Sequence, residues 1–378
     1  MKIYRFIQNY KVEILKEAFT LESGLNFLET AKISFFDINN NLIETKKYGV
    51  IPLQFIYEKI QKNESLDLSR CYIKNFSLSD YRKSNDLPAN SKIDLLDFTA
   101  VDSIFESEKV IDFSLSNFTG SKVNFSNTHF GLGNLSFLKS EFGDFKVLFK
   151  GTSYSEGNNT FQYVKFNNGN VNFDNSTFEN GNLSFVNTYF GDGNSSFKNI
   201  HFGNGDVSFA FSTFNKGNIT FDKSIFNGDE VSFSKVDFGS GKVDFRRVLF
   251  GDGKIDFEEI SLAPKNKLVF RRANFGSSSV SFNEAHLKGC SVDFEEAEFK
   301  NGKLNFFKLT AQSLSLNHCF LNCNIDMRID DCHTIDLSQS IVHNIIDLNP
   351  GLSNMNIHEL NLSGVRNMGD IFLSLIHI

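Results

Sequence analysis

The sequence has no tryptophan, and it contains only 4 prolines and 5 cysteines among 378 residues. An odd and low number of cysteines does not suit a disulfide framework and is compatible with a reducing compartment. The sequence also lacks a run of about 18 consecutive apolar residues, and residues 1–9 contain no continuous apolar segment. We therefore expect neither a membrane span nor a secretory signal, and we predict a cytoplasmic protein.

The sequence also lacks a strong excess of either acidic or basic residues. Asp and Glu number 45 against 38 Lys and Arg, which gives a net charge of −7 and no block of like charge. This balance argues against nucleic acid as a partner, because nucleic-acid-binding domains usually carry a basic patch. The 40% share of apolar residues is enough to bury a core, so the chain is not expected to be disordered. The abundance of Phe, Asn, Lys and Ile fits an AT-rich bacterial genome.

The abundant residue is phenylalanine, which recurs in two series with a spacing of 12 residues. The first series comprises Phe113, Phe125, Phe137, Phe149, Phe161, Phe173, Phe185, Phe197, Phe209, Phe221, Phe233, Phe245 and Phe257. The second series comprises Phe118, Phe130, Phe142, Phe166, Phe178, Phe190, Phe202, Phe214, Phe226, Phe238 and Phe250, with Tyr154 in the remaining place. After one inserted residue near Pro264, the two series resume at Phe270 and Phe275. These residues are predicted to form the core ladder of an internal repeat.

Each 12-residue unit contains two strand-like steps. An aliphatic residue, such as Val123 or Leu135, stands two positions before most first-series phenylalanines, and a small or β-branched residue, such as Ser140, stands two positions before the second series. This alternation indicates β-strands, and a helical period of 3.6 residues cannot produce it. Glycines such as Gly181 and Gly217 lie between the units, where we expect turns in which glycine adopts a positive φ.

The repeat predicts a coil in which equivalent residues stack. Strands in neighbouring turns lie about 4.8 Å apart, so the length of a turn must be a multiple of the repeat. One unit per turn would leave no room for stacked phenylalanine rings at close-packed density. Two units per turn give a coil of about 24 residues with four faces.

Three segments resemble the motif of pentapeptide-repeat proteins: Thr188-Tyr189-Phe190, Ala273-Asn274-Phe275 and Ala297-Glu298-Phe299. The resemblance covers roughly residues 64–365 and implies a right-handed, quadrilateral parallel β-helix. This chain differs from the family by alternating steps of five and seven residues. The expected fold is all-β, a right-handed parallel β-helix with a small α/β cap at the N-terminus.

The ends of the chain do not follow the regular repeat. We expect residues 1–63 to form a cap, with a hairpin at 33–43 and a short helix at 52–60, that covers the open first coil. The solenoid is expected to comprise degenerate coils at 64–106, regular repeats at 107–310 and narrower degenerate coils at 311–372. Residues 373–378 match one reading frame of a common sequencing adaptor, which predicts a non-native tail on a gene fragment.

Two motifs are candidate metal sites. Segments such as Gly191-Asp192-Gly193 and Gly251-Asp252-Gly253 are similar to calcium-binding β-rolls, but that motif requires a period of about nine residues. His318-Cys319, Cys323 and Cys332-His333, with Cys290 upstream, offer soft ligands at a spacing that is not a standard zinc pattern. We interpret both sets as structural and expect no metal or other cofactor.

No catalytic constellation is visible. Glu258-Glu259 and Glu295-Glu296 are adjacent pairs, whose side chains alternation would direct apart, so they do not suit the paired carboxylates of a glycosidase. A ladder of outward hydroxyl groups could bind ice, although an ordinary solvated strand face explains it better. This ladder includes Ser136, Thr160, Ser184, Ser196, Ser208, Thr220 and Ser232.

The sequence therefore predicts a non-enzymatic scaffold that presents a rigid surface to an unidentified protein partner. A homodimer through a terminal coil is a further expectation. Two alternatives remain open: a DNA mimic that protects gyrase, as in some pentapeptide-repeat proteins, and a binding module of a longer enzyme whose C-terminal part is missing. The near balance of acidic and basic residues over 105–310 weakens the first alternative.

Overall fold

The computed structural model describes residues 9–21, 24–349 and 355–373. The chain divides into two compact units between Leu183 and Ser184. Both consist of parallel β-coils of about 24 residues, about 13 in all, so the expected β-solenoid with two repeats per turn is confirmed. Residues 374–378 of the expected non-native tail lie outside the described residues.

The strands are short because each side of a coil is short. The first unit contains β1 (Asn9–Leu15), β2 (Phe19–Thr20), β3 (Asn26–Phe27), β4 (Thr30–Phe36), β5 (Leu42–Val50), β6 (Leu66–Asp67), β7 (Cys71–Lys74), β8 (Ile93–Thr99), β9 (Ile104–Glu106), β10 (Val110–Asp112), β11 (Ser116–Asn124), β12 (His129–Phe130), β13 (Asn134–Ser136), β14 (Glu141–Phe142), β15 (Val147–Leu148), β16 (Ser153–Tyr154), β17 (Asn159–Thr160), β18 (Val171–Asn172) and β19 (Thr177–Phe178). β20 (Leu183–Ser184) lies at the division. The second unit contains β21 (Ser195–Ser196), β22 (His201–Phe202), β23 (Val207–Ser208), β24 (Ile219–Thr220), β25 (Ile225–Phe226), β26 (Glu230–Ser232), β27 (Val243–Asp244), β28 (Leu249–Phe250), β29 (Lys254–Asp256), β30 (Lys267–Val269), β31 (Ser279–Ser281), β32 (His286–Asp293), β33 (Glu298–Phe299), β34 (Lys303–Asn305), β35 (Thr310–Ser315), β36 (Phe320–Leu321), β37 (Asn324–Asp326), β38 (Asp331–Asp336), β39 (Ile341–Val342), β40 (Ile346–Leu348), β41 (Asn356–Asn361), β42 (Arg366–Asn367) and β43 (Ile371–Leu373).

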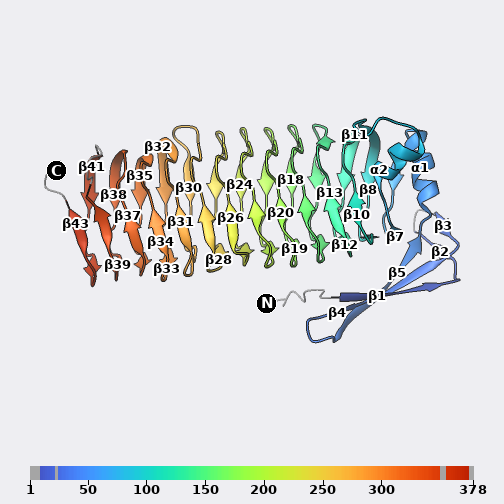
Figure 1. Cartoon of the computed structure of the whole chain (residues 1–378), viewed down its shortest axis with the longest axis horizontal. Helices are drawn as coiled ribbons and strands as arrows, with labels where there is room; N and C mark the ends of the chain where they lie inside the picture. Colours follow the sequence, from blue (N-terminus) through green and yellow to red (C-terminus); the bar gives the residue numbers. More distant parts are fainter. Residues whose placement is uncertain (1–8, 22–23, 350–354, 374–378) are drawn as a thin grey trace. The chain divides into compact units, whose positions relative to one another are not determined.

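Register shows that a circuit takes two repeats. β10 pairs in parallel with β13, and Ile111 lies opposite Leu135, 24 residues further along the chain. In the second unit β31 pairs with β34 in the same way, with Val280 opposite Leu304 (Figure 1). β11 spans a corner of its coil, since its Phe118 pairs with Phe142 of β14 and its Val123 pairs with Val147 of β15.

The phenylalanine rings fill the interior of each coil. Every member of both series is buried, with at most 6% of its surface exposed. Rings one coil apart stack face to face, as for Phe113 and Phe137, whose centroids are 4.8 Å apart with 4° between the ring planes. Rings of neighbouring columns meet edge to face, as for Phe113 and Phe125 at 5.5 Å and 89°. Both arrangements suit the charge distribution of aromatic rings.

The small residues before the second series have a second role besides saving space. The buried hydroxyl of Ser140 donates a hydrogen bond to the carbonyl oxygen of Phe113 in the preceding coil at 2.8 Å. Ser224 donates in the same way to Phe197 at 2.6 Å. These bonds satisfy carbonyl groups at the corner where the chain leaves a first-series phenylalanine, so the interior leaves few buried polar groups unpaired.

The reason expected for the turn glycines is wrong at most positions. Gly181, Gly217 and Gly241 have no positive φ, and what excludes a side chain there is the neighbouring coil. A Cβ on Gly181 would lie 1.7 Å from the carbonyl oxygen of Gly157, and one on Gly217 would lie 1.9 Å from that of Gly193. Positive φ values occur instead at the tight corners, two residues after the first-series phenylalanines, for example at Asn187 (φ 56°).

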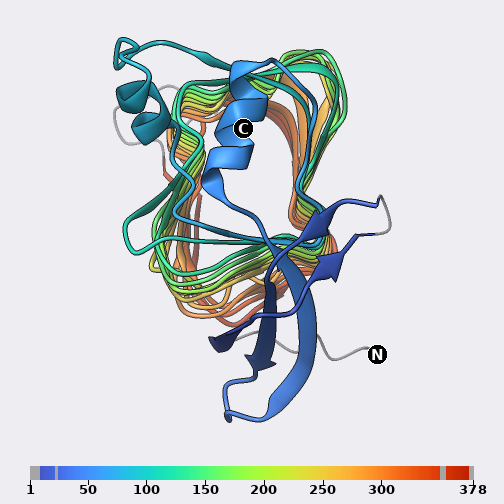
Figure 2. The ribbon, with the colours of Figure 1, turned by 90° about the vertical axis from the view of Figure 1, so that its right-hand side faces the viewer.

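The N-terminal segment of the first unit has two separate parts. Helix α1 (Leu53–Gln61) lies across the open end of the first coil and buries Ile56 and Ile60 (Figure 2). β4 and β5 form an antiparallel hairpin, and β1 adds a third strand beside β4. We call these three strands the arm. The arm does not cover the end of the coil; it packs on the side.

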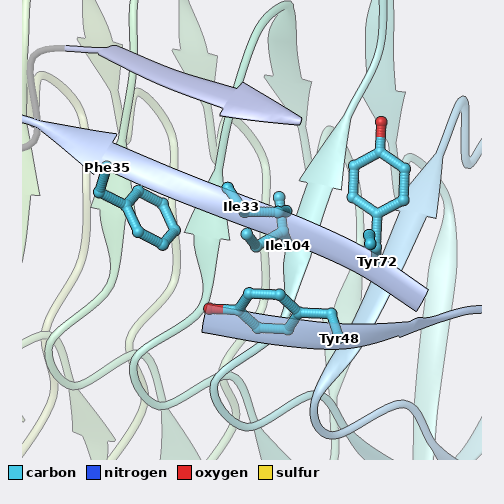
Figure 3. Packing of buried hydrophobic residues seen from close by; sticks show 6 residues of the cluster. Ile33, Phe35, Tyr48, Tyr72 and Ile104 are labelled. Atoms are coloured by element: carbon cyan, nitrogen blue, oxygen red, sulfur yellow. The ribbon is translucent and has the colours of Figure 1, made fainter. Parts of the chain in front are cut away.

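Aromatic and aliphatic residues hold the arm against the coil. Ile33, Phe35 and Tyr48 of the arm contact Tyr72 and Ile104, which point out of the coil (Figure 3). Tyr72 and Ile104 are only 5% and 0% exposed, because the arm covers them. This outer face of the first coils is therefore part of a hydrophobic core, which the sequence did not predict.

The degenerate coils depart from 24 residues for visible reasons. Helix α2 (Leu78–Ser84) is inserted in the first coil, so Leu66 of β6 lies opposite Phe98 of β8. The residue inserted near Pro264 lengthens one circuit, so that Val243 lies opposite Leu268. Towards the C-terminus Ile325 lies opposite Ile346, only 21 residues away, because the steps shorten there. Neither helix in the described residues is long and apolar enough to cross a membrane.

Candidate functional site

Arginine gathers at one corner of the second unit. Of the nine arginines in the sequence, four occupy the two positions after a first-series phenylalanine in consecutive coils, and a glutamate pair occupies the same positions in the next coil. We call this group the corner cluster; it consists of Arg246, Arg247, Arg271, Arg272, Glu295 and Glu296. The corner places the second residue of each pair at positive φ, as for Arg247 (φ 56°) and Arg272 (φ 58°).

The arginines of the two coils bind carboxylates on opposite sides. Arg247 donates through Nε and one terminal nitrogen to both oxygens of Asp222, in the preceding coil, at 2.9 and 2.7 Å. Arg272 donates to Glu296, in the following coil, at 2.6 and 3.2 Å. Like charges one coil apart repel, so each guanidinium group leans away from the other and towards its own carboxylate.

The first residue of each pair also binds carboxylates, but Arg246 finds its partner within its own coil. Arg246 binds Asp244 of its own coil with donor–acceptor distances of 2.6 to 3.0 Å. Arg271 binds Asp293 and Glu295 of the following coil, both at 2.7 Å. Every arginine of the corner cluster is therefore held in place by an ion pair, although between 42% and 66% of each side chain is exposed.

The corner cluster encloses a cavity of about 350 Å³, lined by the four arginines and the two glutamates. A guanidinium group has five N–H donors, and Arg247 commits only its Nε and one terminal nitrogen to Asp222. The uncommitted donors around the cavity match the oxygen atoms of a planar carboxylate. The geometry therefore offers an acidic guest hydrogen-bond donors on oriented arginines, whose charges are already paired with those of neighbouring carboxylates.

Electrostatics in the corner cluster follow these pairs. The hydrogen bond from Arg272 lowers the pKa of Glu296, and the same bond raises the pKa of Arg272. For Asp244, burial alone would raise the pKa, but the hydrogen bonds and charge of Arg246, together with the charge of Lys242, outweigh burial and lower it. The ion pairs therefore favour the charged forms of Arg272, Glu296 and Asp244.

The adjacent glutamates considered from the sequence as catalytic pairs bind separate partners. Glu295 and Glu296 bind Arg271 and Arg272. Glu259 lies 3.3 Å from Lys235, and Glu258 accepts a hydrogen bond from Ser281 at 2.7 Å. Each carboxylate has its own partner, and neither pair converges on one point.

The cysteines considered for zinc are parts of the coil interior. Cys319 is buried and its thiol lies 3.0 Å from the carbonyl oxygen of Phe294, which is the place that a serine hydroxyl takes in other coils. Burial raises the pKa of Cys319 and of Cys323 to about 12, which disfavours the thiolate needed for metal binding. His318 is exposed at the adjacent corner, so it does not point inward with Cys319. In the described ranges no three His, Cys, Asp or Glu side chains are grouped closely enough to hold a metal ion.

The aspartates of the segments considered for calcium have partners within the repeat: Asp192 accepts a hydrogen bond from Lys216 in the next coil at 2.6 Å, and others cap turns. Asp252 accepts a hydrogen bond from the backbone N–H of Ser277 in the next coil at 2.9 Å, and Asp206 accepts one from Glu230 at 3.0 Å. Asn218 accepts the corresponding bond from Lys242 at 3.0 Å. Asparagine and aspartate are interchangeable here because both supply an acceptor oxygen, which explains the mixture of the two in the repeat.

The hydroxyl ladder borders a polar groove in the first unit. Ser136 and Thr160 line a cavity of about 780 Å³ together with Ser79 and Asp112. Ser79 hydrogen-bonds to Asp112, and Arg82, which is 3% exposed, donates to the carbonyl oxygen of Ser114 at 3.0 Å. The groove is fixed by α2, an element that sequence reasoning missed.

Comparisons with protein-family models, with curated proteins and with solved structures gave no match. The structure has the stacked parallel coils and regularly spaced buried phenylalanines expected of a β-solenoid, but no family model confirms the resemblance to pentapeptide-repeat proteins. The corner cluster was not predicted from the sequence. Its signal is nevertheless visible as the doublets Arg246-Arg247 and Arg271-Arg272 after first-series phenylalanines.

Proposed function

We propose that this protein is a non-catalytic β-solenoid scaffold whose corner cluster binds an acidic segment of a protein partner. The observation that carries the proposal is the cavity lined by the four arginines with Glu295 and Glu296, where Arg247 and Arg272 are oriented by carboxylates of different coils and keep further donors uncommitted. Arginine is enriched in protein interfaces because its fork of donors binds carboxylates with defined geometry. The rigid core supports this role, since it fixes the corners and leaves outward positions free to vary.

The alternative of a DNA mimic needs a continuous acidic surface. Outward carboxylates of the second unit are instead paired with cations: Asp244 with Arg246, Asp256 with Lys254 and Asp326 with Arg328. Such pairs cancel the field that a DNA mimic would present. The geometry therefore supports the protein-binding scaffold better.

The test is binding of a fluorescent peptide rich in Asp and Glu, measured by anisotropy. The variant Arg247→Gln/Arg272→Gln is expected to bind at least about tenfold more weakly than the wild type, because charge-assisted hydrogen bonds are lost. Substitution of both arginines by lysine keeps the charge but removes the donor fork, so partial loss is expected.

A matched control exists at the opposite corner. Lys235 and Lys308 also have positive φ (56° and 57°) and also bind glutamates, at 3.3 and 2.9 Å. The variant Lys235→Gln/Lys308→Gln makes the same change in net charge and should bind like the wild type. Equal weakening by both variants would show that only bulk charge attracts the peptide, and absence of binding by the wild type would reject the acidic partner.

A further inference from the structure

Strand β1 forms an open edge of the arm. It pairs with β4 in antiparallel register, from Asn9 opposite Phe36 to Leu15 opposite Thr30. β1 is the terminal strand of its sheet, and in the described part of the chain no strand pairs with its other edge. An edge of seven residues presents unpaired backbone N–H and C=O groups, which is a template for another strand.

Contacts of Tyr10 hold β1 in place against the coil. The hydroxyl of Tyr10 donates to Glu106 at 2.9 Å and accepts a hydrogen bond from the N–H of Leu132 at 3.1 Å. The Tyr10 ring also meets the His129 ring edge to face at 5.0 Å. These contacts fix one end of β1 on the coil, so less conformational entropy would be lost when a second strand docks.

Side chains alternate along β1. Tyr10 and Val12 pack on the hydrophobic cluster beneath the arm, whereas Lys11 and Glu13 are exposed on the opposite face. Ile14 follows on the inner side but is 46% exposed, because it lies beyond the cluster. Glu13 already takes part in a cross-strand pair with Lys32 of β4 at 3.0 Å.

The sequence of β1 is complementary to itself in one orientation. An antiparallel pair centred on Val12 places Lys11 of each copy opposite Glu13 of the other, and Tyr10 opposite Ile14. Both charge pairs are attractive, and the row Lys32, Glu13, Lys11 would alternate in sign across three strands. A parallel pair would instead place like charges opposite each other, which is unfavourable.

We propose that the protein forms a two-fold symmetric homodimer through antiparallel pairing of β1 about Val12. The partner of this edge is a second copy of the chain. The pairing joins two arms into one continuous sheet and covers the exposed part of Ile14. The dimer is independent of the corner cluster and would present two copies of it.

The experiment uses the full chain in sedimentation velocity over a range of concentrations. The wild type is expected to show a reversible monomer–dimer equilibrium. Lys11→Glu and Glu13→Lys each replace two attractive pairs across the interface by two repulsive ones. Each variant alone should therefore dimerise at least about tenfold more weakly than the wild type. An equimolar mixture of the two variants restores both attractive pairs and should dimerise like the wild type. The double variant Lys11→Glu/Glu13→Lys also has attractive pairs across the interface, but its new lysine lies opposite Lys32 of the same arm, so it should dimerise more weakly than the wild type and more strongly than either single variant.

Lys139→Glu is the matched control, because Lys139 is an exposed lysine of the first unit outside the arm. It changes the net charge as Lys11→Glu does, and it should leave dimerisation unchanged. Thermal unfolding of each variant reports whether the arm stays folded. A wild type that is monomeric at about 100 µM would overturn the proposal. A dimer that both single variants leave intact, or a mixture that does not recover, would overturn it as well.

Discussion

The rings of Phe209 and Phe233 lie parallel in adjacent coils, with centroids 5.1 Å apart and 5° between their planes. Phe209 also meets Phe197 and Phe221 edge to face, both at 5.4 Å. It is 0% exposed. Each such ring therefore belongs to one stacked column and at the same time fills the space against another, so its loss opens a gap that the neighbouring columns cannot close.

We predict that Phe209→Ala lowers the free energy of unfolding of the cooperative unit by about 3–5 kcal/mol, as for other buried phenylalanines. Phe209→Asp should be more damaging, because it also buries an unpaired charge. Denaturant titration followed by circular dichroism measures both. Phe211→Ala is the control, since Phe211 is 53% exposed and its truncation should have little effect. Equal losses at both positions would contradict the placement of the rings.

Gly217 tests the close approach of neighbouring coils. A Cβ at this position would lie 1.9 Å from the carbonyl oxygen of Gly193, which is backbone and cannot move aside without displacing a coil. Gly217→Ala should therefore lower the midpoint of unfolding strongly. At Gly251 the nearest atom would be 3.3 Å away, so Gly251→Ala is expected to be much milder. A comparable loss in the two variants would contradict the close approach of the neighbouring coil as the reason for glycine at Gly217.

The fold could be predicted from the sequence because every regular coil needs a phenylalanine ring at the same place in its interior. A ring such as Phe137 must have a ring above and below it, so the spacing of phenylalanines reports the length of a circuit. Helix α2 was missed, since seven residues with a serine cap at Ser77 leave a weak pattern. The hairpin of the arm was predicted, but its position on the side of the coil was not. The sequence does not show that outward residues such as Tyr72 and Ile104 are covered by another segment and not exposed to solvent. The corner cluster depends on side-chain pairs between coils, such as Arg247 with Asp222, which emerge only when the register is known.

His129 lies beneath the arm and gives stability a dependence on pH. Its ring is 4% exposed, contacts Tyr10 and Phe35, and shares a hydrogen bond of 2.7 Å with the hydroxyl of Ser153. Burial lowers the pKa of His129 to about 4. Below its ordinary pKa of about 6.5 the unfolded chain binds a proton that the folded chain does not, so stability falls as the pH drops from about 6.5 towards 4.

The loss attributable to His129 is expected to reach about 3 kcal/mol at pH 4, from the size of this pKa shift. Carboxylates titrate in the same range, so the measurement is the difference between the wild type and His129→Gln across that range. The variant should lose less stability on acidification, because glutamine does not titrate. Parallel curves for the two proteins would show that the ring is not buried beneath the arm.

Glu179 should make the stability of the fold depend on pH in the opposite direction to His129. Burial, together with the charge of Glu156, raises the pKa of Glu179 to about 8. Its Oε2 atom is buried and has no hydrogen-bond partner among the described residues. Above the ordinary carboxyl pKa of about 4.3 the unfolded chain releases a proton that the folded chain retains, so stability falls as the pH rises from about 4.3 to 8.

Glu179→Gln removes this titration and should therefore stabilise the first unit at pH 8 by on the order of 2 kcal/mol, an amount reduced by partial exposure of the side chain. Thermal unfolding of the wild type and variant at pH 5 and pH 8 measures the effect, with Glu156→Gln as the companion. Because Glu156 contributes the smaller of the two causes, its removal should recover only part of the stability. A variant Glu179→Gln that is less stable than the wild type at pH 8 would show that the carboxylate is charged and bound, and not a buried acid.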